Sequence, residues 1–199
     1  MGVLVVKDIR AYYNVMRIAN DIKSRDYLNT LMQKYSPPRI VVSKEDAPIV
    51  VTRGDSKRKA YYKFILAFMD KTRFKRVRVG VDPGKNIGVA VIADGHLIDL
   101  DLLHRVGDLI NLVKDLMDIA EKIVVKIGNG GNSQHIISEL KMIFSKDECK
   151  KGLGSLDIVC VNEYDASSIS YHWFKFRRRY EDMVSALQIA LKYVPEEGL

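Results

Sequence analysis

The stretch RVRVGVDPGKNIGVAVIADG, residues 75–94, constrains the fold more than any other part of the chain. Its first valines occupy every second position, which is the period of a half-buried strand. Pro83 and the glycine after it mark a turn, and residues 87–92 are typical of the returning strand of a hairpin. Asp82 is therefore predicted at the tip of a rigid strand, where it either caps the turn or holds a metal ion.

The composition is that of a globular protein. The chain has 199 residues, of which 47% are hydrophobic and 29% charged, so it can bury a sizeable core. No apolar run approaches the roughly 20 residues that cross a bilayer, and the first residues lack a signal-peptide pattern, so we expect a cytoplasmic protein with no membrane partner. Cys149 and Cys160 form no zinc-binding motif, and Cys160, in an apolar run, is expected in the core.

The charge favours a polyanionic partner. The net charge is +7, and no basic amphipathic anchor for a membrane is visible. The basic residues gather at 56–64, 71–78 and 173–180. Lys57, Arg58 and Lys59 begin a predicted helix, where the helix dipole disfavours cations, which indicates either an anionic partner or a solvated face.

The order of predicted elements divides the chain in two at the basic segment 70–76. Residues 1–74 are predicted to form a small α/β domain: strand 3–6, a helix over 8–25 with Asp8 as N-cap, strands 40–42 and 48–52, and a helix ending near 70. Residues 75–199 are predicted to follow the order βββαβαβα: strands 76–82, 87–93 and 96–102, helix 105–121, strand 122–127, helix 133–145, strand 156–161 and helix 181–193.

This second order is that of the ribonuclease H-like fold, and four motifs within it carry a more specific resemblance. VGVDPGKNIGVAVIADG, VKIGNG, VNEYDAS and RRRYEDMVSALQIAL resemble, in order and spacing, the RuvC/YqgF-type resolvase and nuclease superfamily, and its YqgF-like branch in particular. The resemblance covers about residues 75–194, and the first 74 residues do not share it.

The resemblance implies that Asp82, Glu163 and Asp182 are catalytic residues that converge on Mg²⁺ or Mn²⁺. Such hard ions take oxygen ligands, and two ions about 3.5–4 Å apart can stabilise the attacking and leaving oxygens of a phosphodiester displacement. Each carboxylate also has a structural interpretation: a turn cap for Asp82, an exposed strand-end charge for Glu163, and a first-turn helix acid for Asp182.

The chain departs from the family pattern at several positions. RuvC has a glutamate at the end of the middle strand, where this chain has IGNG, and Ser185 replaces a second acid in the last helix. Asn162 and Tyr164 replace the family's Asp and Arg. The site is therefore either a minimal triad or a degenerate one.

Two further segments are predicted to contact nucleic acid. The loop GNGGNS, residues 128–133, either holds a phosphate on its backbone N–H groups or is a strand-to-helix turn capped by Asn132 or Ser133. The segment before Asp182 mixes aromatic and basic side chains, which suit base stacking and phosphate binding. The predicted nucleic-acid contacts are Lys85, Gly128, Asn129, Gly130, Lys175, Arg177, Arg178 and Arg179.

We therefore predict a metal-dependent nuclease acting on a DNA junction or structured RNA, with a homodimer as the candidate assembly because a symmetric junction needs two active sites. The alternatives are a non-catalytic nucleic-acid-binding protein on a degenerate nuclease fold, an actin-like phosphotransferase suggested by GVDPG, and an assembly protein acting through residues 1–74.

Overall fold

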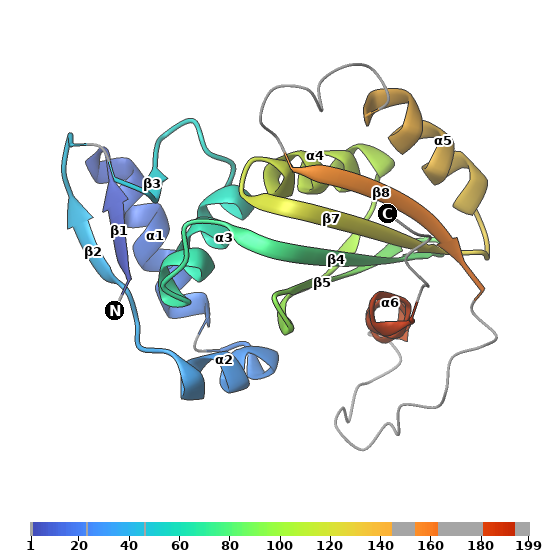
Figure 1. The fold of residues 1–199 in the computed structure, drawn as a ribbon, viewed down its shortest axis with the longest axis horizontal. Helices are drawn as coiled ribbons and strands as arrows, with labels where there is room; N and C mark the ends of the chain where they lie inside the picture. Colours follow the sequence, from blue (N-terminus) through green and yellow to red (C-terminus); the bar gives the residue numbers. More distant parts are fainter. Residues whose placement is uncertain (1, 23, 46, 145–153, 163–180, 194–199) are drawn as a thin grey trace.

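The structure, a computed structural model, describes residues 2–22, 24–45, 47–144, 154–162 and 181–193 (Figure 1). The first half contains a parallel three-stranded sheet of order β2-β1-β3. Its elements are β1 (Val3–Val6), α1 (Ile9–Ile22), the 3₁₀ helix η1 (Asp26–Leu28), α2 (Asn29–Lys34), β2 (Arg39–Val42), β3 (Val50–Val51) and α3 (Lys57–Phe68).

The second half is built on a mixed five-stranded sheet of order β6-β5-β4-β7-β8. Strands β4, β5 and β6 are antiparallel neighbours, whereas β7 and β8 run parallel to β4. The elements are β4 (Phe74–Pro83), β5 (Ile87–Ala93), β6 (His96–Leu103), α4 (Val106–Met117), β7 (Ala120–Gly128), α5 (Ser133–Phe144), β8 (Ser155–Val161) and α6 (Glu181–Leu191). The α/β class is thus confirmed, and the described elements of this second half follow the predicted order βββαβαβα.

The two faces of the large sheet are covered differently. Figure 1 shows α6 on one side of the sheet and α4 and α5 on the other. The alternating valines Val77, Val79 and Val81 of β4 are fully buried in the main core, on the face away from α6. On the opposite face, Ala90 and Ile92 of β5 pack with Ala186 and Ala190 of α6 in a separate small cluster. Gly80 and Asp82, which alternate with the valines, therefore lie on the α6 face.

Local sequence signals account for several helix ends. Asp8 caps α1 as predicted, because its carboxylate accepts hydrogen bonds from the backbone N–H groups of Arg10 (2.9 Å) and Ala11 (3.0 Å). Ser56 caps α3 by accepting from the N–H of Lys59 (2.9 Å). One helical segment, η1 and α2, was not predicted; it is too short to show a period, although its Leu28 and Leu31 are buried.

Two sequence predictions are wrong. Cys160 is exposed, because β8 is the edge strand of the large sheet. Ala120 belongs to β7 and not to the preceding helix, which ends at Met117. Of the three cations that begin α3, Lys57 is exposed, Arg58 pairs with Asp99 and Asp101, and Lys59 pairs with Asp118.

The hairpin between β5 and β6 turns through Asp94 (φ 48°) and Gly95 (φ 88°), the left-handed conformations that an Asp-Gly turn adopts. The Asp94 carboxylate also ties the turn to its surroundings, since it accepts from Lys71 and from the backbone N–H of Arg76 (2.9 Å). Burial alone would raise the pKa of Asp94, but these hydrogen bonds outweigh burial and hold the pKa below its ordinary value.

The pKa of the Asp94 carboxyl is lower in the folded protein than its ordinary value of about 3.8. The ionised carboxylate therefore stabilises the fold at pH values above 3.8, and this stabilisation is lost as the pH falls through the folded-state pKa. Asp94→Asn should therefore destabilise the chain by about 1 kcal/mol at pH 6, and the difference from wild type should shrink below pH ~4. Urea unfolding at both pH values measures this. Glu121→Gln, which removes a carboxylate at an exposed position, is the control for the loss of a surface charge. An Asp94→Asn difference that grows in acid would contradict the assignment.

Candidate active site

Asp82 lies at the end of β4, partly exposed, and its direct partner across the antiparallel pair is Gly88 of β5. Directly opposed residues of neighbouring strands point to the same face of a sheet, so Asp82 and Gly88 share the face that α6 covers. Pro83 and the exposed turn at 84–86 follow. Asp82 is thus held on a strand that is paired on both sides, with β5 and with β7.

Asp182 lies in the first turn of α6, directly over Gly88. A Cβ atom added to Gly88 would be 2.1 Å from the carbonyl oxygen of Asp182 and 3.2 Å from its Cβ. Such contact requires glycine at this position, because any side chain would collide with the helix backbone. Since Gly88 opposes Asp82, the structure brings Asp82 and Asp182 to the same end and the same face of the large sheet.

The rest of α6 is seated by Gly80 and Lys126. A Cβ on Gly80 would be 2.0 Å from the carbonyl oxygen of Ala186, so the helix backbone also rests on β4. Lys126 of β7 is only 4% exposed, and its Nζ donates to the carbonyl oxygens of Ala190 (3.2 Å) and Lys192 at the end of the helix. Burial, with the nearby Arg78, lowers the pKa of Lys126. These contacts fix the axis of α6 and therefore the position of Asp182.

The glycine-rich loop lies beside the turn that follows Asp82. Strand β7 ends at Gly128, and α5 begins at Ser133. Gly131 has a φ of 48°, and a Cβ there would be 2.2 Å from the carbonyl oxygen of Pro83, while the N–H of Asn132 donates to the same oxygen (3.4 Å). The predicted phosphate loop, with Asn129 and Gly130, is therefore next to the predicted carboxylate site.

Gly128 ends β7, within the IGNG stretch that carries no acid. It is two residues beyond Lys126, hence on the α6 face, and it is buried. At the end of β8, Asn162 accepts a hydrogen bond from the side chain of Asn129 (3.4 Å), which joins the ends of β7 and β8. Lys85 is exposed in the turn after Asp82.

The remaining predicted site residues lie outside the described part of the chain: Glu163, Lys175, Arg177, Arg178 and Arg179. Within the described residues, no group of three or more His, Cys, Asp or Glu side chains is arranged to hold a metal ion. Of the three predicted metal ligands, Asp82 and Asp182 lie at the same end of the large sheet, and Glu163 lies outside the described residues.

Sequence reasoning missed the residues that seat α6, namely Gly80, Gly88 and Lys126. The first two do have a signal: small residues recur on the α6-facing positions of β4 and β5, where Gly80, Gly88 and Ala90 interrupt two strongly apolar strands. Small residues at alternate positions of adjacent strands indicate close approach of another backbone. Lys126 has no comparable signal, because a lysine in a strand is ordinarily placed on the solvent side.

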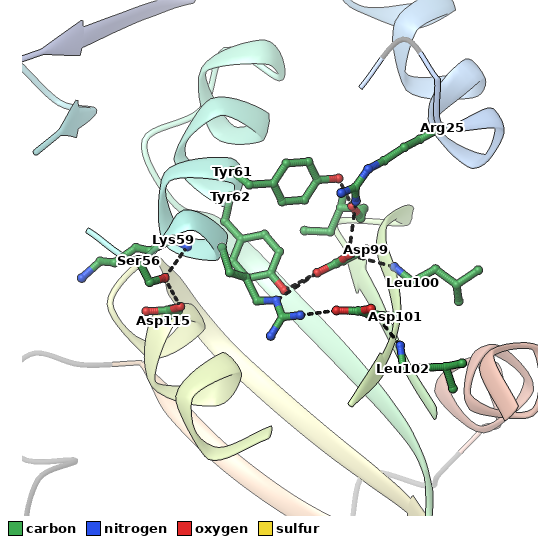
Figure 2. A network of polar contacts seen from close by, with 12 residues as sticks. Arg25, Ser56, Lys59, Tyr61, Tyr62, Asp99, Leu100, Asp101, Leu102 and Asp115 are labelled. Carbon is green, nitrogen blue, oxygen red and sulfur yellow. Dashed lines mark hydrogen bonds and ion pairs between the residues drawn. The ribbon is translucent and has the colours of Figure 1, made fainter. Parts of the chain in front are cut away.

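A second polar cluster surrounds Asp99 of β6 (Figure 2). Asp99 is only 6% exposed and accepts a hydrogen bond from the hydroxyl of Tyr62 in α3 (2.9 Å). Two guanidinium groups flank it, those of Arg58 (3.5 Å) and Arg25 (3.5 Å). Burial raises the pKa of Asp99, although Arg58 and the Tyr62 hydroxyl act in the opposite direction. The cluster joins the first half of the chain to the edge strand of the large sheet.

A comparison of the chain with models of known protein families gave no match, and a comparison with curated proteins gave no similar sequence. Of the helices that the structure describes, none is both long and apolar enough to cross a lipid bilayer.

Proposed function

We propose that residues 75–199 form a ribonuclease H-like domain that hydrolyses phosphodiester bonds of structured nucleic acid in a metal-dependent reaction. The support at the level of the fold is the element order, with three antiparallel strands followed by alternating helices and parallel strands. The resemblance of the four sequence motifs to RuvC/YqgF-type nucleases predicts the same order. The basic character of the chain agrees with a polyanionic substrate.

The observation that carries the proposal is the meeting of Asp82 and Asp182. They come from the first strand of the large sheet and from its last described helix, and Gly88 brings them together on one face. The interpretation of Asp182 as a mere first-turn helix acid does not explain why the helix begins over the partner of Asp82. Two partly exposed carboxylates at one end of a sheet are a donor set that suits a hard divalent ion.

In the proposed reaction, Asp82 and Asp182, with Glu163, would hold Mg²⁺ or Mn²⁺. The ion would supply Lewis-acid stabilisation of the phosphate oxygens. The backbone N–H groups of the loop at 128–130 would orient the scissile phosphate from the neighbouring strand end. Lys85 and the basic residues Lys175, Arg177, Arg178 and Arg179 would contact the phosphates on either side.

One observation favours the second candidate, a nucleic-acid-binding protein without catalysis. The IGNG stretch at the end of β7, where the resembling resolvases have a glutamate, contains no acid, and its Gly128 lies on the same face as Asp82. A site that lacks this ligand holds metal less tightly. Such a protein would bind nucleic acid equally well with and without divalent ions.

Cleavage of labelled four-way DNA junctions and structured RNAs in Mn²⁺ tests the proposal. Wild type should cleave one class, and Asp82→Asn and Asp182→Asn should each lose at least about 100-fold in rate, because loss of a mere outer-shell partner already costs 10–100-fold. Glu121→Gln, an exposed change at the opposite end of β7, should cleave normally.

Binding of the same substrates in EDTA separates the two candidates. Binding without cleavage by wild type, unaffected by Asp82→Asn, would establish the non-catalytic alternative. Circular dichroism melting of each variant shows whether a lost activity reflects a lost fold.

A further inference from the structure

A large open cleft lies between the first half of the chain and the edge strand β6. Its volume is about 1510 Å³, more than the roughly 300–1,000 Å³ of a typical small-molecule pocket. Helices α1 and α2 and the segment between them form one wall, and the start of α3 with β6 forms the other. Met183 of α6, next to Asp182, lines it as well. A cleft of this size suits an extended chain better than a single small molecule.

The outer edge of β6 is closed to pairing with a further strand. The N–H groups of Leu100 and Leu102 donate to the Asp99 (3.0 Å) and Asp101 (2.8 Å) carboxylates, and the carbonyl oxygen of Ile98 accepts from the hydroxyl of Tyr61. Edge groups satisfied in this way do not recruit another chain as a strand. The occupant of the cleft must therefore be recognised by side chains.

Arg25 and Arg58 are held rigidly along this cleft. The Arg25 guanidinium lies over the ring of Tyr61 (4.9 Å to the ring centre), donates to the hydroxyl of Tyr27 (2.7 Å) and pairs with Asp99. Arg58 bridges Asp99 and Asp101. Their side chains remain 37% and 23% exposed, respectively. Planar guanidinium groups fixed before binding are well suited to phosphate groups.

Arg17 of α1 and Lys57 of α3 add two exposed cations to the cleft walls. Neither has an ion-pair partner within the described ranges. The lining also includes four aspartates, but the oxygens of Asp99 and Asp101 are used by the edge of β6 and by the arginines. Asp99 and Asp101 hold Arg25 and Arg58 in place, and the four aspartates of the lining together balance the formal charge of its four cations.

The cleft leads toward the carboxylate site. Asp82 pairs with Gly88, and Gly88 pairs with Leu102 of β6. Leu102 therefore lies about two strand spacings, roughly 10 Å, from Asp82 on the α6 face, whereas Asp101 opposes Val89 on the other face of the sheet. The cleft reaches the α6 face at Leu100 and at Met183, the residue after Asp182, so a strand in the cleft passes around the edge of β6 toward the carboxylates.

We propose that this cleft binds a single strand of nucleic acid and leads it to Asp82 and Asp182, with Arg17, Arg25, Lys57 and Arg58 contacting its phosphates. The proposal rests on the proposed function for the identity of the ligand, but binding in the cleft does not require catalysis.

Fluorescence anisotropy with a labelled 20-nucleotide single strand, in EDTA and over a range of salt concentrations, tests this binding. The test variant is Arg17→Gln with Lys57→Gln, because both side chains are exposed and neither supports Asp99. We expect about 5- to 20-fold weaker binding, a salt slope reduced by about 1.4 for two lost phosphate contacts, and an unchanged melting temperature. The charge-matched control is Lys114→Gln with Lys141→Gln, exposed on α4 and α5, and it should bind as wild type does.

Each outcome decides a different point. Equal affinity and slope for wild type and the Arg17/Lys57 variant would overturn the cleft proposal, even if Asp82-dependent cleavage is found. Weaker binding by this variant, with no cleavage by wild type in Mn²⁺, would support the cleft and reject the nuclease. Equal losses in the test and control variants, or a duplex competing as well as the single strand, would overturn the specific single-strand cleft. Failure of wild type to bind any nucleic acid would overturn both proposals.

Discussion

Asp99→Ala is expected to lower the free energy of unfolding by about 3 to 5 kcal/mol, the usual cost of removing one member of a buried charged cluster. The alanine leaves the buried Tyr62 hydroxyl and the N–H of Leu100 without their acceptor. It also leaves Arg25 and Arg58 facing each other without the carboxylate between them. Urea unfolding followed by circular dichroism measures the loss.

Two variants provide the comparison. Asp99→Asn keeps an oxygen for Tyr62 and Leu100 but removes the charge, so it should cost less than alanine. Asp157→Ala removes a carboxylate that is 54% exposed and lies 3.8 Å from Lys122, and its cost should be below about 1 kcal/mol. If Asp99→Ala were no more destabilising than Asp157→Ala, the cluster would have no part in holding the first half of the chain against β6.

Gly88→Ala is expected to destabilise the chain by about 3 kcal/mol, at the upper end of the range for overpacking. The added methyl group would collide with the carbonyl carbon and oxygen of Asp182, which are backbone atoms of a packed helix and cannot rotate away. The start of α6 must then lift from β5. Because Asp182 moves with it, Gly88→Ala should also abolish any activity that depends on Asp82 and Asp182 acting together.

Gly107→Ala is the matched control for this change. Gly107 lies in the first turn of α4, and a Cβ there meets nothing within 4 Å. Alanine should be neutral or stabilise the helix by up to about 1 kcal/mol. Thermal and urea unfolding of the two variants, with cleavage assays on both, gives the comparison. A Gly88→Ala protein as stable as wild type would mean that α6 does not rest on β5 as described.

The fold of the large sheet could be predicted because its strands are long and regular. The alternating valines of β4, and the Asp-Pro-Gly turn after them, are local patterns that indicate both the strand and its reversal. The segment at 26–34 was not predicted because its helices are short, so its conformation is decided by what it packs against and not by a period. The prediction for Cys160 was wrong because an apolar run does not distinguish a central strand from an edge strand.

The identity of the candidate site residues could be predicted from the sequence, but their arrangement in space could not. The resemblance named Asp82 and Asp182, but their proximity depends on the close contact of Gly88 with the backbone of α6. The small residues of β4 and β5 indicate that some backbone lies close, but not that it is the helix that carries Asp182. The cleft at β6 could not be predicted for the same reason. Its cations come from α1, α3 and the segment between α1 and η1, and the sequence around Asp99 indicates only an ordinary polar residue of a strand.

The place of α6 near the end of the chain also determines when Asp82 and Asp182 can come together during synthesis. Among the described elements, α6 is the last to be synthesised, yet it supplies Asp182 and covers one face of β4 and β5. Chains are made from the N-terminus at about 5–20 residues per second, so the sheet with Asp82 emerges from the ribosome several seconds before its partner helix. A nascent chain therefore carries the first carboxylate without the second. Any activity that needs both Asp82 and Asp182 can begin only after residue 182 has been synthesised and α6 has packed against Gly80 and Gly88.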